Sequence, residues 1–241
     1  GPRPAQALAS FKVWAYNRIG SCAAVWDHPE AVARREQPRG RWASDKKMLP
    51  VVFVSALRAM GWPNSATDSE VGVDTVADPK RLCSALDLCG SDLICLEDLQ
   101  WVDKWDAPEW LLRPPDPGAW ATLDALIMRQ HSLPLRAWRD LLDKNDDNQV
   151  CWEEFRSACR RLKFRGNIAG AWRALDADVD GRITLQEYHP PTAQMLGSFK
   201  RFSDTNFGSV ELAFKSFDAD GSGSLTFSEL RRACTRRWWK G

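Results

Sequence analysis

Three acidic segments in the second half of the chain have the residue types and the spacing that bind a hard divalent cation. They are Asp143–Glu154, Asp176–Glu187 and Asp218–Glu229. In each, oxygen-bearing side chains alternate along a short loop that closes with a glutamate at its twelfth position. Calcium takes about six to eight oxygen ligands, and such a loop points alternate side chains at one centre. Each segment therefore predicts a calcium site.

The predicted ligands stand at positions one, three, five, seven and twelve of each loop, the seventh through its main-chain carbonyl. They are Asp143, Asn145, Asp147, Gln149 and Glu154; Asp176, Asp178, Asp180, Arg182 and Glu187; and Asp218, Asp220, Ser222, Ser224 and Glu229. The Asp176 loop has the most carboxylates and is expected to bind best. Asn148 stands at the glycine position of the first loop, where asparagine tolerates a positive φ. We expect two or three Ca²⁺ ions, with Mg²⁺ as an alternative at the weaker sites.

Apolar residues at helical spacing flank the three loops. Trp138 precedes the first loop and Phe155 follows it in this rhythm, which predicts helix–loop–helix units. The eighth position of each loop is apolar (Val150, Ile183 and Leu225). This predicts short β-bridges that join the loops two at a time.

In these loops and their connecting segments the chain resembles the calmodulin-type EF-hand superfamily, especially the tandem EF-hand arrays of single-celled algae. Residues 171–176, 198–202 and 207–210 are similar to the connecting segments of those arrays. The resemblance is strong over about residues 131–237 and weaker over 50–105. It implies an all-α fold of paired EF-hand helix–loop–helix modules with short inter-loop β-bridges. It also implies calcium binding without catalysis.

Two degenerate copies of the same unit are predicted upstream. The segment Asp87–Asp98 keeps the first aspartate and an apolar eighth residue, but it has cysteine at positions three and nine. Cysteine is a poor calcium ligand, so we expect a hand with a poor or empty site. Residues 53–62 align with the exit helix at 155–164, which places a vestigial loop over residues 41–52 without the needed carboxylates.

The spacing of the loops suggests how the hands pair. We expect the vestigial hand to pair with the Asp87 hand, and the Asp143 hand with the Asp176 hand. The Asp218 hand is then left over, and it packs on another lobe, on itself in a dimer or on a different chain. The expected division is a basic, extended N-terminal arm (1–40), a degenerate lobe (41–107), a linker and connecting helix (108–130), an EF-hand pair (131–190) and a linking helix with the extra hand (191–241).

Composition excludes several classes of protein. A net charge of +1 over 241 residues argues against a nucleic-acid-binding protein. The longest apolar run, residues 51–54, is far short of the roughly 20 residues of a transmembrane helix. Seven cysteines without a CxxC pair are not a disulfide framework or zinc ribbon, which indicates an intracellular, reducing compartment. Runs of basic residues follow the loops, so peripheral contact with an anionic membrane surface is a further alternative.

The functional interpretation follows from what the chain has and lacks. No nucleophile elbow, phosphate loop or hydrolase motif occurs, so we expect no enzyme activity, and an enzyme accessory domain is the least favoured alternative. Calcium sensors use methionine-rich grooves, whereas this chain has 4 Met and 13 Trp. This favours a structural subunit with protein partners in a larger intracellular assembly, in which Ca²⁺ rigidifies the fold. The alternative is a calcium sensor that regulates a partner protein.

Overall fold

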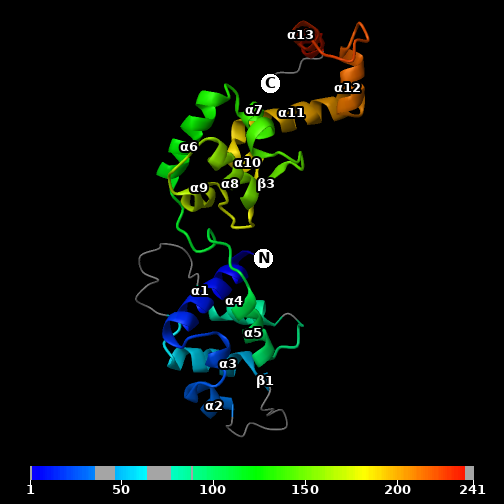
Figure 1. Cartoon of the computed structure of the whole chain (residues 1–241). Helices are drawn as coiled ribbons and strands as arrows, with labels where there is room; N and C mark the ends of the chain where they lie inside the picture. Colours follow the sequence, from blue (N-terminus) through cyan, green and yellow to red (C-terminus); the bar gives the residue numbers. More distant parts are fainter. Residues whose placement is uncertain (1, 36–46, 64–76, 88, 237–241) are drawn as a thin grey trace. The chain divides into compact units, whose positions relative to one another are not determined.

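The computed structural model describes residues 2–35, 47–63, 77–87 and 89–236 (Figure 1). Within these residues the chain is mostly helical, and its strands form two small two-stranded sheets. The predicted all-α class is therefore confirmed. None of the described helices has the length and apolar character that crossing a bilayer requires. Two compact units are present, residues 1–123 with 164–181, and residues 124–163 with 182–241.

The first unit consists mainly of the N-terminal helices. Its elements are α1 (Pro2–Arg18), the 3-10 helix η1 (Ala23–Val25), α2 (Pro29–Arg35), β1 (Lys47–Met48), α3 (Pro50–Ala59), α4 (Pro79–Leu86), β2 (Ile94–Cys95) and α5 (Leu96–Lys104), with the start of α6 (Pro117–Gln130) and all of α9 (Ile168–Leu175). Asp78 caps α4, because its carboxylate accepts a hydrogen bond from the Lys80 amide at 2.8 Å and Pro79 opens the helix.

Aromatic rings occupy the centre of this unit's apolar core. Phe11 of α1 lies edge-on to Phe53 of α3, with ring centroids 6.2 Å apart, and edge-on to Trp62 at 5.9 Å. All three side chains are buried. Burying a phenyl side chain contributes roughly 2 kcal/mol to folding, so these rings tie α1 to α3.

The expectation of an extended N-terminal arm is wrong. Ala7, Phe11 and Ala15 lie on one face of α1, and they belong to the same buried core as α3, α4 and α5. The Asp103 carboxylate of α5 also accepts a hydrogen bond from the Cys22 amide at 2.7 Å. Alanine side chains are small, so they allow close helix packing but do not mark an apolar face in the sequence. The basic charge of the segment was therefore its most visible feature.

The sheet β1–β2 joins the vestigial hand to the Asp87 hand. Met48 and Ile94 are antiparallel partners and both are buried. Counted from Arg41 and Asp87, each is the eighth residue of its loop. This strand pairing is the one that the predicted pairing of the two hands requires, although the start of the vestigial loop, residues 41–46, lies outside the described residues.

The second unit carries the remaining helices. Its elements are α6 from residue 124 onward, α7 (Pro134–Ala137), the π-helix η3 (Trp138–Leu142), β3 (Gln149–Cys151), α8 (Trp152–Arg161), β4 (Arg182–Thr184), α10 (Leu185–Tyr188), α11 (Pro190–Phe207), α12 (Val210–Phe217) and α13 (Phe227–Arg236). In β3 and β4, Val150 and Ile183 are antiparallel partners and both are buried. The predicted β-bridge between the Asp143 and Asp176 loops is confirmed.

Phenylalanine rings join the last helices of this unit. Gly208 ends α11 with a φ of +88°, a conformation that glycine adopts without strain. The turn brings the Phe207 ring edge-on to Phe217 of α12, with centroids 5.1 Å apart. The C-terminal hand, α12 and α13 with the Asp218 loop between them, therefore follows directly from the end of α11 (Figure 1).

Candidate calcium sites

Four loops of the chain share one backbone conformation. Their first residues are Asp87, Asp143, Asp176 and Asp218. In each loop the sixth residue has a positive φ: Asp92 (56°), Asn148 (65°), Gly181 (83°) and Gly223 (72°). The prediction that Asn148 adopts the positive φ of the glycine position is confirmed. The degenerate Asp87 loop makes the same sharp turn as the others.

The first aspartate of each loop fixes this turn with its own carboxylate. In the Asp176 loop, the carboxylate accepts hydrogen bonds from the amides of Asp180 at 3.0 Å and Gly181 at 3.3 Å, the fifth and sixth residues. The same pair of bonds occurs in the loops of Asp87, Asp143 and Asp218. The side chain at position one is thereby turned toward the loop centre.

The carboxylate at position twelve is held by a helix cap. Glu187 accepts hydrogen bonds from the Thr184 amide at 2.8 Å and from its hydroxyl at 2.9 Å, at the start of α10. The equivalent amide bond joins Asp98 to Cys95, Glu154 to Cys151 and Glu229 to Thr226. The sequence therefore positions the carboxylate at position twelve through ordinary helix capping.

Carboxylate oxygens gather in two of the three predicted sites. One group is Asp176, Asp178 and Glu187, and the other is Asp218, Asp220 and Glu229; the oxygens of each group lie within 4.8 Å of one another. Both loops are continuous stretches of twelve residues. A set of oxygen donors alone suits a hard cation such as Ca²⁺ or Mg²⁺ rather than a soft metal. The residues present therefore fit the predicted ion.

The Asp176 carboxylate is the most buried of these groups, with no exposed surface. Burial raises its pKa to about 6, against the effect of the nearby Arg173 charge. The Trp172 indole N–H donates a hydrogen bond to its Oδ2 at 3.1 Å, and the Arg173 guanidinium donates to its main-chain carbonyl. Sequence analysis did not identify Trp172 as a contact of this loop. Its spacing, four residues before Asp176 on one helix face, was the available signal.

The Asp218 loop is more exposed to solvent. Hydrogen bonds with Ser222 lower the pKa of Asp220, and those with Thr226 lower the pKa of Glu229. The Ser222 hydroxyl also donates to the carbonyl of Ser224, the predicted seventh-position ligand, at 3.1 Å. The lowered pKa values of Asp220 and Glu229 favour the charged carboxylates that cation binding requires.

Two other predicted ligands of the Asp176 loop lie outside its carboxylate group. The Asp180 amide donates to the Asp178 carboxylate at 3.1 Å, but the Asp180 carboxylate is not in the group. Arg182, whose carbonyl is the predicted seventh ligand, lies in β4. Ion binding by these two residues stays a prediction.

The Asp143 loop does not bring its carboxylates together in such a group among the described residues. The Asn145 amide side chain donates to one oxygen of Asp147 at 3.1 Å, and the Gln149 main-chain N–H donates to the other at 2.9 Å. Asp147 is therefore bonded to its loop neighbours. A third site here, with Asp143 and Glu154 as ligands, stays a prediction.

We expect Asp98→Asn to leave the calcium stoichiometry unchanged. Asp98 stands at position twelve, but the Asp87 loop has Cys89 and Cys95 where oxygen ligands are needed. The Asp98 carboxylate accepts from the Cys95 amide at 2.8 Å, a bond that an asparagine oxygen can also accept. Isothermal titration of the variant and the parent chain with calcium measures the comparison, and a lost site in the variant would contradict this assignment.

The comparison with protein families supports the assignment at the C-terminal hand. Residues 209–238 match the EF-hand domain family. This match and the two carboxylate groups fit an EF-hand protein, and they indicate calcium binding. No curated protein and no solved structure matches the chain.

Proposed function

We propose that this chain is a structural subunit of a larger intracellular assembly, in which two or three Ca²⁺ ions rigidify its hands and protein partners cover its C-terminal hand. We further propose that the chain has no catalytic activity and that it functions in a reducing compartment. The proposal also includes a tandem arrangement of all five hands, like the arrays of single-celled algae. An accessory domain of an enzyme is the least favoured alternative.

The observation that carries this proposal is the exposed apolar face of the C-terminal hand. At position eight of their loops, the other hands bury Met48, Ile94, Val150 and Ile183 in their β-bridges. Leu225 at this position is only partly buried and lies outside the described strands. Phe227 at position ten is 78% exposed, whereas Leu96, Trp152 and Leu185 are partly buried. A partner that covers this hand would complete its apolar contacts.

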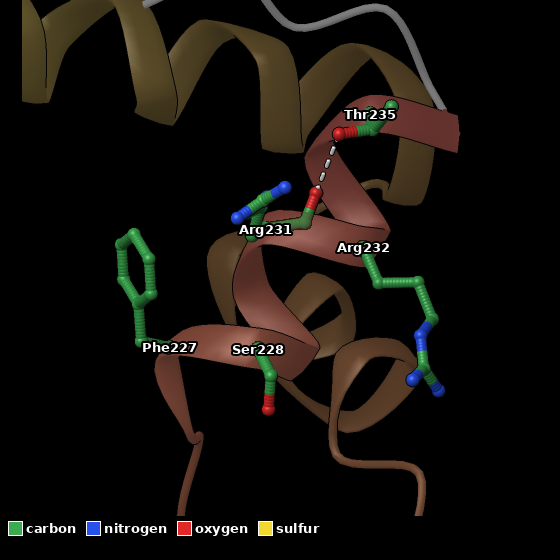
Figure 2. Close-up of a pocket in the computed structure, with 5 residues that line it drawn as sticks. All are labelled: Phe227, Ser228, Arg231, Arg232 and Thr235. Atoms are coloured by element: carbon green, nitrogen blue, oxygen red, sulfur yellow. Dashed lines mark hydrogen bonds between the residues drawn. The ribbon is translucent and has the colours of Figure 1, made fainter.

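Arginine side chains of α13 add positive charge to this surface. Figure 2 shows Phe227 and Arg231 extending from one side of the helix and Arg232 from the other, with Ser228 between them. Together with Thr235 they line a surface pocket. A phenyl ring and a guanidinium group on the same side of the helix suit a protein segment that presents both apolar and acidic side chains.

The positions of the methionines argue against the alternative, a calcium sensor. Met48 and Met60 are buried in the core of the first unit, whereas Met195 of α11 is 49% exposed in the second unit. A sensor opens an adaptable, methionine-rich groove on binding calcium. Of these three methionines, two are thus buried and one is exposed, which favours the structural role.

Binding of the dye 8-anilinonaphthalene-1-sulfonate tests the two roles. For a structural subunit, we expect saturating calcium to raise the unfolding temperature without increasing dye fluorescence, because the ions stiffen hands that are already formed. Phe227→Ser is expected to lower dye fluorescence equally with and without calcium. A several-fold rise in fluorescence on adding calcium to the parent chain would reject the structural role in favour of the sensor.

A further inference from the structure

The segment Trp110–Asp116, which we term the strap, is hydrogen-bonded at one end to the start of α9. The Asp116 amide donates a hydrogen bond to the Gly170 carbonyl at 2.9 Å. The Asn167 side-chain amide donates to the Asp116 carboxylate at 3.0 Å, while Asn167 also caps α9. The end of the strap is thus bonded to the first turn of this helix.

Gly170 permits this close approach. A Cβ atom at this position would lie 2.6 Å from the Asp116 Cβ and 2.3 Å from the Asn167 side-chain nitrogen. Neither distance is compatible with normal van der Waals contact. The sequence of α9 therefore leaves space for the strap.

The other end of the strap lies against the Asp176 loop. The Trp110 ring packs on Trp172 with centroids 5.8 Å apart, and both side chains are buried. A Cβ on Gly181, the sixth loop residue, would lie 3.4 Å from the Trp110 ring. Trp110 therefore contacts both the helix that precedes the loop and the turn of the loop itself.

Trp172 connects the strap to a predicted calcium ligand. Its indole N–H holds Oδ2 of Asp176 at 3.1 Å. The residues four positions before the first aspartate of the other three loops are Cys83, Arg139 and Phe214. An indole donor at this position is thus specific to the Asp176 loop among the four.

We propose that Trp172 is a positioning residue for the calcium ligand Asp176, and that the strap sets the calcium affinity of this loop by holding Trp172 in place. The inference rests on the proposed calcium binding. A donor fixed outside the ligand set orients the carboxylate and reduces the reorganisation that ion binding requires. By linkage, calcium in the loop stabilises the strap on α9 to the same extent.

The experiment uses the full chain with Glu154→Gln and Glu229→Gln, so that the Asp176 loop dominates the calcium titration. In this background Trp172→Phe keeps an aromatic side chain, although a smaller one, and removes the N–H donor. We expect the calcium affinity to fall about tenfold. The matched control is Trp138→Phe, a buried indole before a different loop, which should change the affinity less than about twofold.

Asp116→Ala tests the strap without touching the aromatic core. We expect it to weaken calcium binding about threefold, because it removes the side-chain hydrogen bond between the strap and Asn167. Asp106→Ala, at an exposed residue before the strap, serves as the control and should leave the affinity unchanged.

Calcium is also expected to change the tryptophan emission of the background chain, and Trp110→Phe should reduce that change.

The outcomes separate the inference from the function on which it rests. An affinity of Trp172→Phe equal to that of Trp138→Phe, in a background chain that binds calcium, overturns the positioning role. An affinity of Asp116→Ala equal to that of Asp106→Ala overturns the role of the strap. A background chain that takes up no calcium rejects calcium binding by this loop, and the inference falls with it.

Discussion

The Glu187→Gln variant is expected to lose one site from a calorimetric calcium titration. Glu187 is the predicted last ligand of the Asp176 loop, and at this position glutamate supplies two oxygens and a full negative charge. Glutamine keeps one oxygen for the helix cap at Thr184, so the loop and α10 should stay folded. Losing the charge and the second oxygen should weaken binding by roughly 100-fold, beyond the range of the titration.

Glu153→Gln is the matched control for this change. Glu153 is an exposed residue at position eleven of the Asp143 loop, where it forms an ion pair with Arg156 at 3.4 Å rather than serving as a predicted ligand. This substitution removes the same charge and should leave every site in place. An unchanged stoichiometry in Glu187→Gln would show that the Asp176 loop does not bind calcium.

The Phe53→Ala variant is expected to destabilise the N-terminal core without changing the calcium stoichiometry. Phe53 has no exposed surface and lies edge-on to Phe11, so its removal leaves a cavity between α3 and α1. Such truncations cost about 3–5 kcal/mol. Urea unfolding followed by circular dichroism measures the free energy, and a calcium titration in native buffer measures the stoichiometry.

Val51→Ala on the same helix is the control for this measurement. Val51 is 68% exposed, so its truncation should change the free energy of unfolding by less than about 0.5 kcal/mol. A loss below about 1 kcal/mol in Phe53→Ala would contradict the view that the vestigial hand is an essential part of the core.

The loops were the part of this molecule most accessible to sequence analysis. Each element of a loop has a local cause: an aspartate that accepts two amide hydrogen bonds, a residue at position six that tolerates positive φ, and a capping carboxylate at position twelve. Asn148 and Glu187 show how directly residue type sets this geometry. The pairing of Met48 with Ile94 was accessible for the same reason, because position eight is defined by counting along each loop.

The parts that sequence analysis missed depend on contacts between distant residues. The contact of Trp110 with Trp172 spans many positions, and no periodic pattern links the two. The burial of Ala7 and Ala15 depends on α4 and α5, since alanine alone indicates neither core nor surface. One missed contact is local: the hydrogen bond from the Asn145 side chain to Asp147 joins residues two positions apart, and loop spacing alone does not predict it.

The Asp87 loop reaches its folded form through main-chain donors to Asp87 and Asp98, without a favourable set of metal ligands. Its lobe should therefore keep its shape when a chelator removes free divalent ions. In the proposed structural role, a fall in calcium concentration would then soften the later hands and leave this lobe unchanged.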